Sequence, residues 1–319
     1  MENRRLGQTE IEVTAIGLGV MQFAGGKGLF GMGMPVLSGE QMNTIVKTAL
    51  DGGINWFDTA EMYGRGRSER ALANGLKAAG IEAGQVQIAT KWLPLLRTAA
   101  NINRTIDRRL HFLDGYPIAL YQVHLPWSFS PPEAEMAAMA GLFEAGKIRA
   151  VGVSNFSAGQ MRRAQTALEK RGLTLAANQV HYSLLQRGIE RNGVLETAKE
   201  LGVTIIAYTP LEKGVLSGIY HKDPALLDQK SLFRRSSMRR QIESSRPLVE
   251  ALEEIATHYE ATAAQVALNW LIHFHGQTVV AIPGASKVTQ VEQAAGAMAF
   301  KLSGEELAQL DELSRRLFD

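Results

Sequence analysis

The sequence has no cysteine among its 319 residues, and this absence narrows the functions it can have. Without thiols the chain can form no disulfide scaffold, use no thiolate nucleophile and bind no metal through a thiolate. We also expect no metal site of another kind. The absence fits a reducing compartment, so we expect a cytoplasmic protein.

Long apolar runs and an excess of charge are also missing. No window approaches the ~18 uninterrupted apolar residues of a membrane span, and the N-terminal segment MENRRLGQTE has no apolar run behind its charges. We therefore expect neither a membrane anchor nor a signal peptide. The 34 basic and 32 acidic residues leave a net charge of +2, and only the segment 231–240 is strongly basic. This balance argues against a nucleic-acid partner, and we expect 231–240 to be a solvated loop.

What the sequence does contain is an alternation of short β-branched runs with longer amphipathic segments of helical period, from one end to the other. The helical segments carry start signals, such as Ser38 with Gln41 as a capping box before TIVKTAL. The candidate strands are 16–19, 54–58, 86–90, 118–124, 150–154, 176–180, 203–208 and 278–282.

Alternating β and α elements at this spacing predict a parallel sheet, either open or closed into a barrel. Eight such units in about 250 residues are typical of a (β/α)8 TIM barrel. The remaining residues fit an N-terminal hairpin (4–6 with 11–13), a glycine-rich loop (20–37), a long segment (209–246) and a last helix (303–317). We predict a single α/β domain over 1–319, folded as a (β/α)8 barrel.

The strand ends carry the residues with chemical potential. In a barrel these ends meet at one mouth, where the active sites of this fold lie. The second strand ends in Asp58 with Tyr63 five residues later, the third ends near Lys91 and the fourth in His124. An ammonium group near a tyrosine can lower the phenol pKa from about 10 by ~1–3 units. We expect the four to meet, and Tyr63 to act as a general acid with a lowered pKa.

Seven segments resemble, in order, the signature blocks of the aldo-keto reductase superfamily. They are FDTAEMYGRGRSE (57–69), IATKW (88–92), LYQVHLP (120–126), IRAVGVSNF (148–156), NQVHYSLL (178–185), YTPLEKGVLSG (208–218) and IPGASK (282–287). The resemblance extends from about residue 4 to residue 315. It implies a catalytic tetrad of Asp58, Tyr63, Lys91 and His124. In this tetrad Tyr63 protonates a carbonyl oxygen while hydride passes from C4 of the reduced nicotinamide to the carbonyl carbon.

The resemblance also implies an NADPH site. Ser154, Asn155 and Gln179 would bind the carboxamide of the nicotinamide, and Tyr208 would stack on its ring. Ser286 and Lys287 stand where the family holds the 2′-phosphate, which favours NADPH over NADH. The other implied cofactor contacts are Val20, Met21, Asp58, Thr209, Pro210, Leu211, Lys213, Gly284, Gln290 and Gln293. Three positions depart from the family: Gln293-Ala294 replaces Glu-Asn near the adenosine, and His181 replaces a smaller or acidic residue.

The expected partner is a small carbonyl compound. Trp92, Trp127 and Phe129 are predicted to line its pocket with apolar surface, whereas Trp56 lies within a strand and is predicted to be core. Loops such as 125–132 and 209–246 set specificity in barrels. Nothing in the sequence indicates an oligomeric state.

Two other functions stay open at this stage. One is a cofactor-binding regulatory or redox-sensing subunit with little turnover, and the other is an isomerase or aldolase that forms a Schiff base at Lys91.

The G-x-G-x-x-G at 26–31 is not followed by a helix, so we interpret it as a lid over the mouth rather than a dinucleotide turn. The segment 141–147 resembles a P-loop, but Ile148 stands where that motif ends in a serine or threonine.

Overall fold

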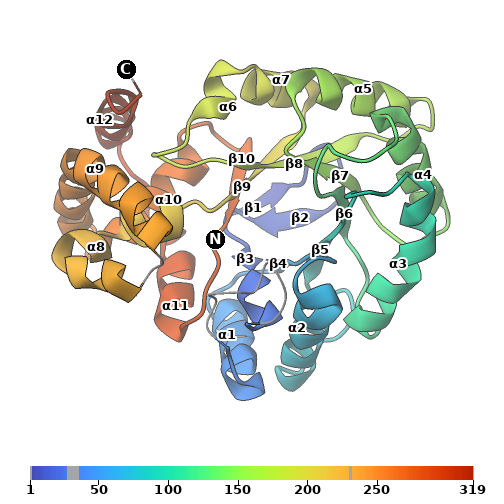
Figure 1. Ribbon diagram of the computed structural model, residues 1–319, viewed down its shortest axis with the longest axis horizontal. Helices are drawn as coiled ribbons and strands as arrows, with labels where there is room; N and C mark the ends of the chain where they lie inside the picture. The colour runs from blue at the N-terminus through green and yellow to red at the C-terminus, as the bar shows by residue number, and fades with distance from the viewer. Residues whose placement is uncertain (1, 27–35, 230–231, 319) are drawn as a thin grey trace.

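A ring of parallel strands stands at the centre of the molecule, surrounded by helices (Figure 1). The computed structural model describes residues 2–26, 36–229 and 232–318. Bridges from Ile16 to Ala281 and from Gly19 to Gly284 join the first strand of the ring to the last. In order around the sheet the strands are β3 (Leu18–Gly19), β4 (Trp56–Asp58), β5 (Gln87–Trp92), β6 (Leu120–Val123), β7 (Val151–Ser154), β8 (Leu175–His181), β9 (Thr204–Tyr208) and β10 (Val279–Ile282). The predicted (β/α)8 barrel and its eight strands are confirmed, with boundaries within two residues.

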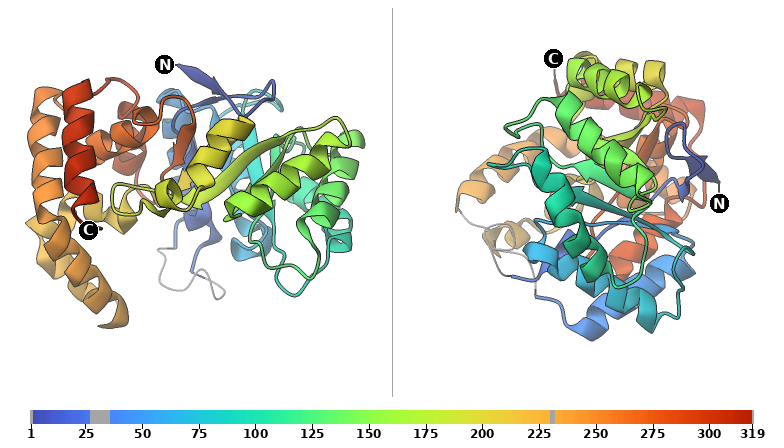
Figure 2. Two further views of the ribbon diagram at one scale, coloured as in Figure 1. Left: turned by 90° about the horizontal axis from the view of Figure 1, so that it is seen from above. Right: turned by 90° about the vertical axis from the view of Figure 1, so that its right-hand side faces the viewer.

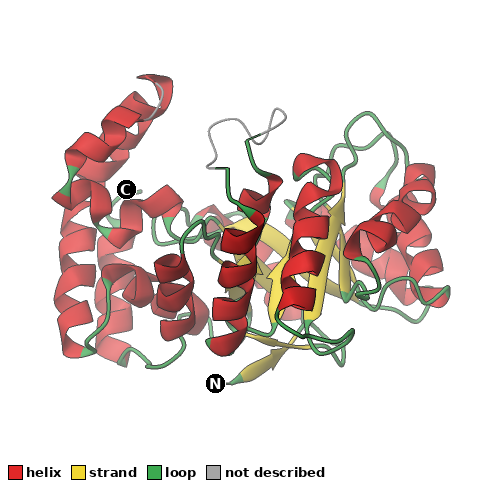
Figure 3. Ribbon diagram, turned by 90° about the horizontal axis from the view of Figure 1, so that it is seen from below, coloured by secondary structure: helices red, strands yellow, loops and turns green. Residues whose placement is uncertain are grey.

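The predicted N-terminal hairpin closes one end of the barrel (Figure 3). It consists of antiparallel β1 (Asn3–Arg5) and β2 (Glu12–Thr14). The Arg4 guanidinium donates to the Val279 carbonyl at 2.7 Å, and the Gly7 amide donates to the Thr204 hydroxyl at 2.7 Å. Both acceptors lie at the N-terminal ends of their strands. The C-terminal strand ends are therefore left as the mouth of the barrel.

The outer ring of helices buries the outward-facing side chains of the strands. The Ser38 hydroxyl accepts from the Gln41 amide, which confirms the predicted capping box. No helix among the described residues has the length and apolar character to cross a membrane. The ring consists of α1 (Gly39–Asp51), α2 (Arg67–Ala78), α3 (Ala100–Leu113), α4 (Pro132–Glu144), α5 (Ala158–Glu169), α7 (Val194–Leu201), α10 (Ala263–His273) and α11 (Val288–Gly296). Short helices in the connections are η1 (Met21–Ala24), η2 (Gly64–Gly66), α6 (Gly188–Arg191), η3 (Glu212–Ser217), α8 (Ile219–Lys222) and η4 (Pro224–Gln229).

The prediction of a loop over 231–240 is wrong, because residues 232–240, the described part of this segment, form the beginning of the helix α9 (Leu232–His258). Met238, Ile242 and Leu252 are buried along one face of this helix, so it follows an apolar stripe of helical spacing. Its arginine Arg235 pairs with Asp228 at 3.2 Å. The predicted last helix is confirmed as α12 (Gly304–Arg315), which packs beside α9 at one side of the barrel (Figure 2). Most of the glycine-rich lid, residues 27–35, lies outside the described residues.

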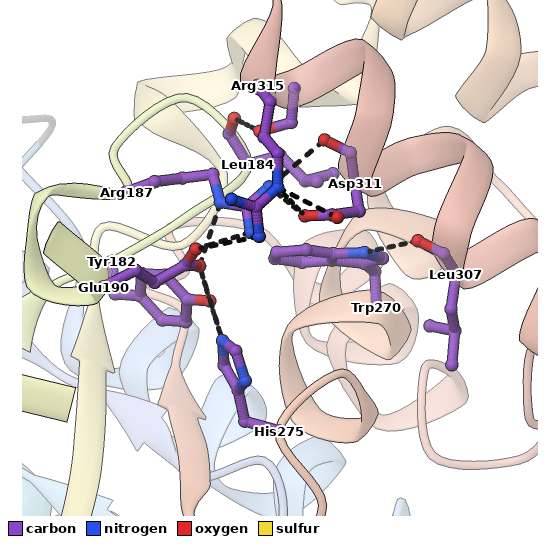
Figure 4. A network of polar contacts seen from close by, with 10 residues as sticks. Tyr182, Leu184, Arg187, Glu190, Trp270, His275, Leu307, Asp311 and Arg315 are labelled. Carbon is purple, nitrogen blue, oxygen red and sulfur yellow. Dashed lines mark hydrogen bonds and ion pairs between the residues drawn. The ribbon is translucent and has the colours of Figure 1, made fainter. Parts of the chain in front are cut away.

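A buried arginine joins α12 to the connection that follows β8 (Figure 4). Arg187 is 2 % exposed and pairs with Glu190 at 2.6 Å and with Asp311 of α12 at 2.5 Å. Its guanidinium also lies 5.0 Å from the centre of the Trp270 ring. The Tyr182 hydroxyl donates to the same Glu190 carboxylate at 2.5 Å. This cluster anchors α12 through charges that are almost removed from water.

Candidate active site

An ion pair buried at the mouth is the centre of the candidate site. The Lys91 ammonium lies 2.5 Å from Asp58 Oδ1 and donates to the Thr59 carbonyl at 2.9 Å. The two charged side chains are 0 % and 2 % exposed. Burial is the largest single effect and lowers the pKa of Lys91, but charge attraction and hydrogen bonds from Asp58 and Tyr63 together outweigh it and hold the pKa above its usual value. Lys91 is therefore an ammonium ion over the physiological range.

The second carboxylate oxygen of Asp58 accepts from two buried amides. Gln179 Nε2 donates at 2.9 Å and Gln122 Nε2 at 3.4 Å. Donors on both oxygens fix the carboxylate and stabilise its charge in a site with little water. Gln122 was not among the predicted site residues. Its position two residues before His124 on β6 places it on the same face of that strand, which is the signal that could have found it.

Tyr63 and His124 complete the cluster. Lys91 Nζ lies 5.2 Å from the centre of the Tyr63 ring, and the Tyr63 and His124 rings meet edge to face with centres 5.8 Å apart. The four residues of the predicted tetrad thus lie together. Desolvation and the Lys91 charge hold the pKa of His124 well below its usual value, so its imidazole is neutral.

The expectation that the Tyr63 pKa is lowered is wrong in direction. Burial raises the pKa of Tyr63, and this effect exceeds the opposing attraction from Lys91. The cation nonetheless favours the phenolate over what burial alone would allow. Tyr63 therefore keeps its proton at neutral pH, as a proton donor requires.

Neutral polar residues form a second group on the neighbouring strands. The Ser154 hydroxyl donates to the Gln179 carbonyl at 2.9 Å, and the Tyr208 hydroxyl donates to Asn155 Oδ1 at 3.0 Å. Asn155 has a φ of 60°, a left-handed conformation that asparagine tolerates better than most residues. Gln179 connects this group to the ion pair through its bond to Asp58. The four residues predicted to hold the nicotinamide thus lie together beside the charged cluster.

A helix start lies at the end of β10, where the phosphate contacts were predicted. The backbone amides of Ser286 and Lys287 donate to Gln290 Oε1 at 2.8 Å and 3.2 Å. Gln290 therefore caps α11, while the Lys287 side chain is exposed at the first turn. Gln293 lies one turn further along and is partly exposed. A lysine at a helix N-terminus suits a phosphate dianion.

The predicted contacts Val20 and Met21 are followed by Gln22, which the sequence analysis missed. A Cβ at Gly284 would lie 2.3 Å from Gln22 Nε2, so the end of the Gln22 side chain packs directly against this glycine and would have to move for a larger residue. Gln22 Oε1 is buried and has no hydrogen-bond partner among the described residues. A buried unpaired amide oxygen beside Gly284 fits a site that is completed by a hydrogen-bond donor from a bound cofactor.

The connection after β9, where contacts with the cofactor were predicted, has a strained backbone. Thr209 and Lys213 have φ values of 54° and 55°, in the left-handed region that favours glycine. Pro210 is buried, Leu211 is partly buried and the Lys213 side chain is exposed. Strain of this kind persists only where surrounding contacts over-determine the backbone, and it clusters at ligand sites.

An apolar rim lies on two connections at the mouth. Trp127 and Phe129 follow β6 and are 63 % and 70 % exposed, and Leu95 and Leu96 on the connection after β5 are also exposed. The Phe129 amide donates to the Arg97 carbonyl at 2.8 Å, which ties the two connections together. Exposed aromatic side chains beside a polar cluster are typical of a binding surface.

The prediction that Trp92 lines the pocket is wrong. Trp92 is 0 % exposed, and its indole donates to Asn101 of α3 at 3.0 Å. Side chains alternate along a strand, so Trp92 must face the outer helices when Lys91 faces the interior. Trp56 is core, as predicted, with an exposure of 2 %.

Comparison with known proteins gives one consistent result. The model of the aldo/keto reductase family matches residues 15–315. An uncharacterised oxidoreductase of Mycobacterium tuberculosis is 38% identical over 310 residues, which are 95% of this chain and 90% of that protein. An NADP(+) aldo-keto reductase of Schizosaccharomyces pombe is 35% identical, covering 91% of this chain and 85% of its own. A crystal structure of a thermostable aldo-keto reductase with the inhibitor epalrestat superposes with a TM-score of 0.78 at 32% identity, covering 98% of this chain and 100% of that one.

Proposed function

The chain belongs to the aldo/keto reductase family, and from this membership and the geometry of the mouth we propose that it reduces aldehydes or ketones to alcohols with NADPH. The observation that carries the proposal is the buried pair of Asp58 and Lys91 beside the ring of Tyr63. Such a pair has no evident structural need at a solvent-facing barrel mouth, because two buried charges cost desolvation energy. It does supply a fixed positive charge next to a phenol.

The proposed mechanism assigns one role to each side chain. Bound at this mouth, the reduced nicotinamide would supply the hydride that the carbonyl carbon accepts. Tyr63 donates its proton to the carbonyl oxygen, and the Lys91 ammonium stabilises the phenolate that remains. Asp58 keeps Lys91 charged and in place. The neutral imidazole of His124 donates a hydrogen bond to the carbonyl oxygen and orients it.

The residues present fit the proposed cofactor. Ser154, Asn155 and Gln179 offer donors and acceptors for a carboxamide, and Tyr208 offers a ring face. The exposed ammonium of Lys287 at the start of α11 supports a 2′-phosphate and hence NADPH, in line with the cofactor in the name of the Schizosaccharomyces pombe relative. We expect a higher kcat/KM with NADPH than with NADH. The apolar rim around Trp127 favours carbonyl groups attached to aromatic or aliphatic bodies.

The proposal is tested by the variant Tyr63→Phe, which removes only the proton donor. We expect turnover of an aldehyde panel to fall by about 10²- to 10⁴-fold, the usual contribution of general acid catalysis. The dissociation constant for NADPH, measured by fluorescence titration, should stay near the wild-type value. Tyr259→Phe is the matched control, because its hydroxyl donates to Glu306 of α12 away from the mouth. Wild-type turnover in Tyr63→Phe would refute the role of Tyr63.

Two alternatives are separated by simple assays. A regulatory or redox-sensing subunit would bind NADPH, but NADPH would not be oxidised when any carbonyl compound of the panel is added. Schiff-base chemistry at Lys91 would need a neutral amine, and the raised pKa of Lys91 disfavours that form. Borohydride reduction in the presence of substrate would trap a covalent adduct only if the Schiff-base mechanism operated.

A further inference from the structure

His181, one of the residues that depart from the family pattern, lies against Tyr208. The two residues are direct neighbours in the parallel register of β8 and β9. Their rings stack nearly parallel, with centres 5.3 Å apart and an interplanar angle of 12°. One face of the Tyr208 ring is therefore covered by the imidazole.

His181 is held in this position by Glu212. The imidazole Nε2 lies 2.7 Å from Glu212 Oε1, and the Ser183 hydroxyl donates to the same oxygen at 2.7 Å. The Glu212 side chain is 7 % exposed. Burial raises the pKa of Glu212, but the bonds from His181 and Ser183 and the charge of Lys213 outweigh it, so the pKa lies below its usual value. Glu212 is therefore a carboxylate with two side-chain partners on β8 and the residues after it.

Glu212 also belongs to the strained connection after β9. Its φ is 47°, and Thr209 and Lys213 on either side are left-handed as well. This backbone conformation is unfavourable for a glutamate, so it persists only where other contacts compensate for its energy. The bonds of its carboxylate to His181 and Ser183 are such contacts. They tie the connection 209–213 to the end of β8.

We propose that His181 and Glu212 form a positioning pair that fixes the Tyr208 ring and the connection 209–213 for the nicotinamide end of the cofactor. The proposal rests on the proposed function. His181 covers one face of Tyr208 and Asn155 holds its hydroxyl, so the nicotinamide stacks on the other face of a ring that is already immobile. A ring ordered before binding loses less conformational entropy when the ligand arrives.

The opposite arrangement makes the opposite prediction. If the imidazole occupied the face that the nicotinamide needs, it would have to leave before the cofactor could stack. Removal of the imidazole would then tighten cofactor binding. The sign of the change in affinity therefore decides between a support and a gate.

The test compares two ligands on His181→Ala. NADP+ carries the nicotinamide, whereas 2′,5′-ADP carries the adenosine and the 2′-phosphate without it. We expect the dissociation constant of NADP+ to rise about 3- to 10-fold, because the energy of one aromatic stacking contact is the upper limit of what this support can contribute, and that of 2′,5′-ADP to stay unchanged. His181→Phe keeps a ring at this position and should recover most of the NADP+ affinity. His258→Ala is the matched control, because His258 is exposed and pairs with Glu306 away from the mouth.

Each other outcome has a clear meaning. Unchanged or tighter binding of NADP+ by His181→Ala would overturn the positioning role. Equal weakening of NADP+ and 2′,5′-ADP would also overturn it, because a general loss of structure affects both ligands. If the wild-type protein bound neither NADP+ nor NADPH, the proposed function would fail instead.

Discussion

The variant Asp58→Asn tests the buried ion pair at the centre of the site. Asparagine has nearly the shape of aspartate, so the substitution removes a charge without opening a cavity. The Lys91 ammonium then keeps the Thr59 carbonyl, at 2.9 Å, and the asparagine amide oxygen as acceptors, but it has lost its counter-ion and stays fully buried. A buried charge that has lost its counter-ion is strongly destabilising.

The expected magnitude follows from the burial of both partners. Removal of one partner from a buried pair costs about 3–5 kcal/mol in the free energy of unfolding. The matched control is Asp51→Asn, which breaks an exposed pair with Lys47 at 2.7 Å, with side chains 62% and 65% exposed. Water and salt screen such a surface pair, so we expect a much smaller loss.

The pH dependence gives the sharper measurement. Without Asp58, burial is the largest effect left on Lys91 and exceeds the opposing effect of Tyr63, so we expect its pKa in the folded state to fall below the unfolded value of about 10.4. The unfolded chain then binds more protons than the folded chain, so the stability of the variant rises as the pH increases toward about 10. The loss in free energy of unfolding of Asp58→Asn relative to the wild type should therefore be largest near pH 6 and become smaller toward pH 10. Urea unfolding at pH 6, 8 and 10 measures it.

The reasoning would be refuted by a loss of stability in Asp58→Asn no larger than in Asp51→Asn. A loss that did not change between pH 6 and pH 10 would also contradict it, because Lys91 would then carry the same charge in both folded proteins. Carbonyl reduction should fall together with stability at low pH. At high pH, a stable variant that remains inactive would separate the catalytic role of the charge from its structural cost.

Two further substitutions test buried charges outside the tetrad. Burial raises the pKa of Glu135 on α4 to about 7, so ionisation of this carboxyl destabilises the fold as the pH rises from about 4.5 to 7. In urea unfolding, Glu135→Gln should therefore be more stable than the wild type at pH 8, by at most about 3 kcal/mol, and equally stable at pH 4. Arg187→Ala leaves the carboxylate of Glu190 without its closest cation and should lower the unfolding free energy by about 3–5 kcal/mol, whereas Arg162→Ala, which breaks an exposed pair, should change it little. Equal effects of the two arginine variants would contradict the importance assigned to the Arg187 cluster.

The barrel and the tetrad could be predicted from the sequence because both depend on order along the chain. Eight alternating units limit the sheet to a few topologies, and parallel strands bring their C-terminal ends to one mouth. Asp58, Lys91 and His124 stand at three consecutive strand ends, so their meeting needs no further information. Trp92 was wrongly assigned to the pocket because the alternation of side chains along a strand was not applied to β5. That alternation places the Trp92 side chain on the face of the strand opposite to Lys91.

Other features depend on segments that are far apart in sequence. The direction of the Tyr63 pKa depends on how completely neighbouring segments exclude water, and no motif carries that information. The α9 helix was not predicted because it contains Pro247, and helices usually end at a proline. The apolar stripe of α9 is evident only where it packs against the rest of the barrel.

The sequence by itself thus determined the order of strands and helices, the mouth of the barrel and the identity of the residues there, because these follow from local periodicity. The tertiary structure decided which charges are buried and which rings face each other. The pairing of His181 with Glu212 joins residues 31 positions apart, and that of Arg187 with Asp311 spans 124 positions. Such contacts arise from packing, where burial and distance determine both stability and proton affinity.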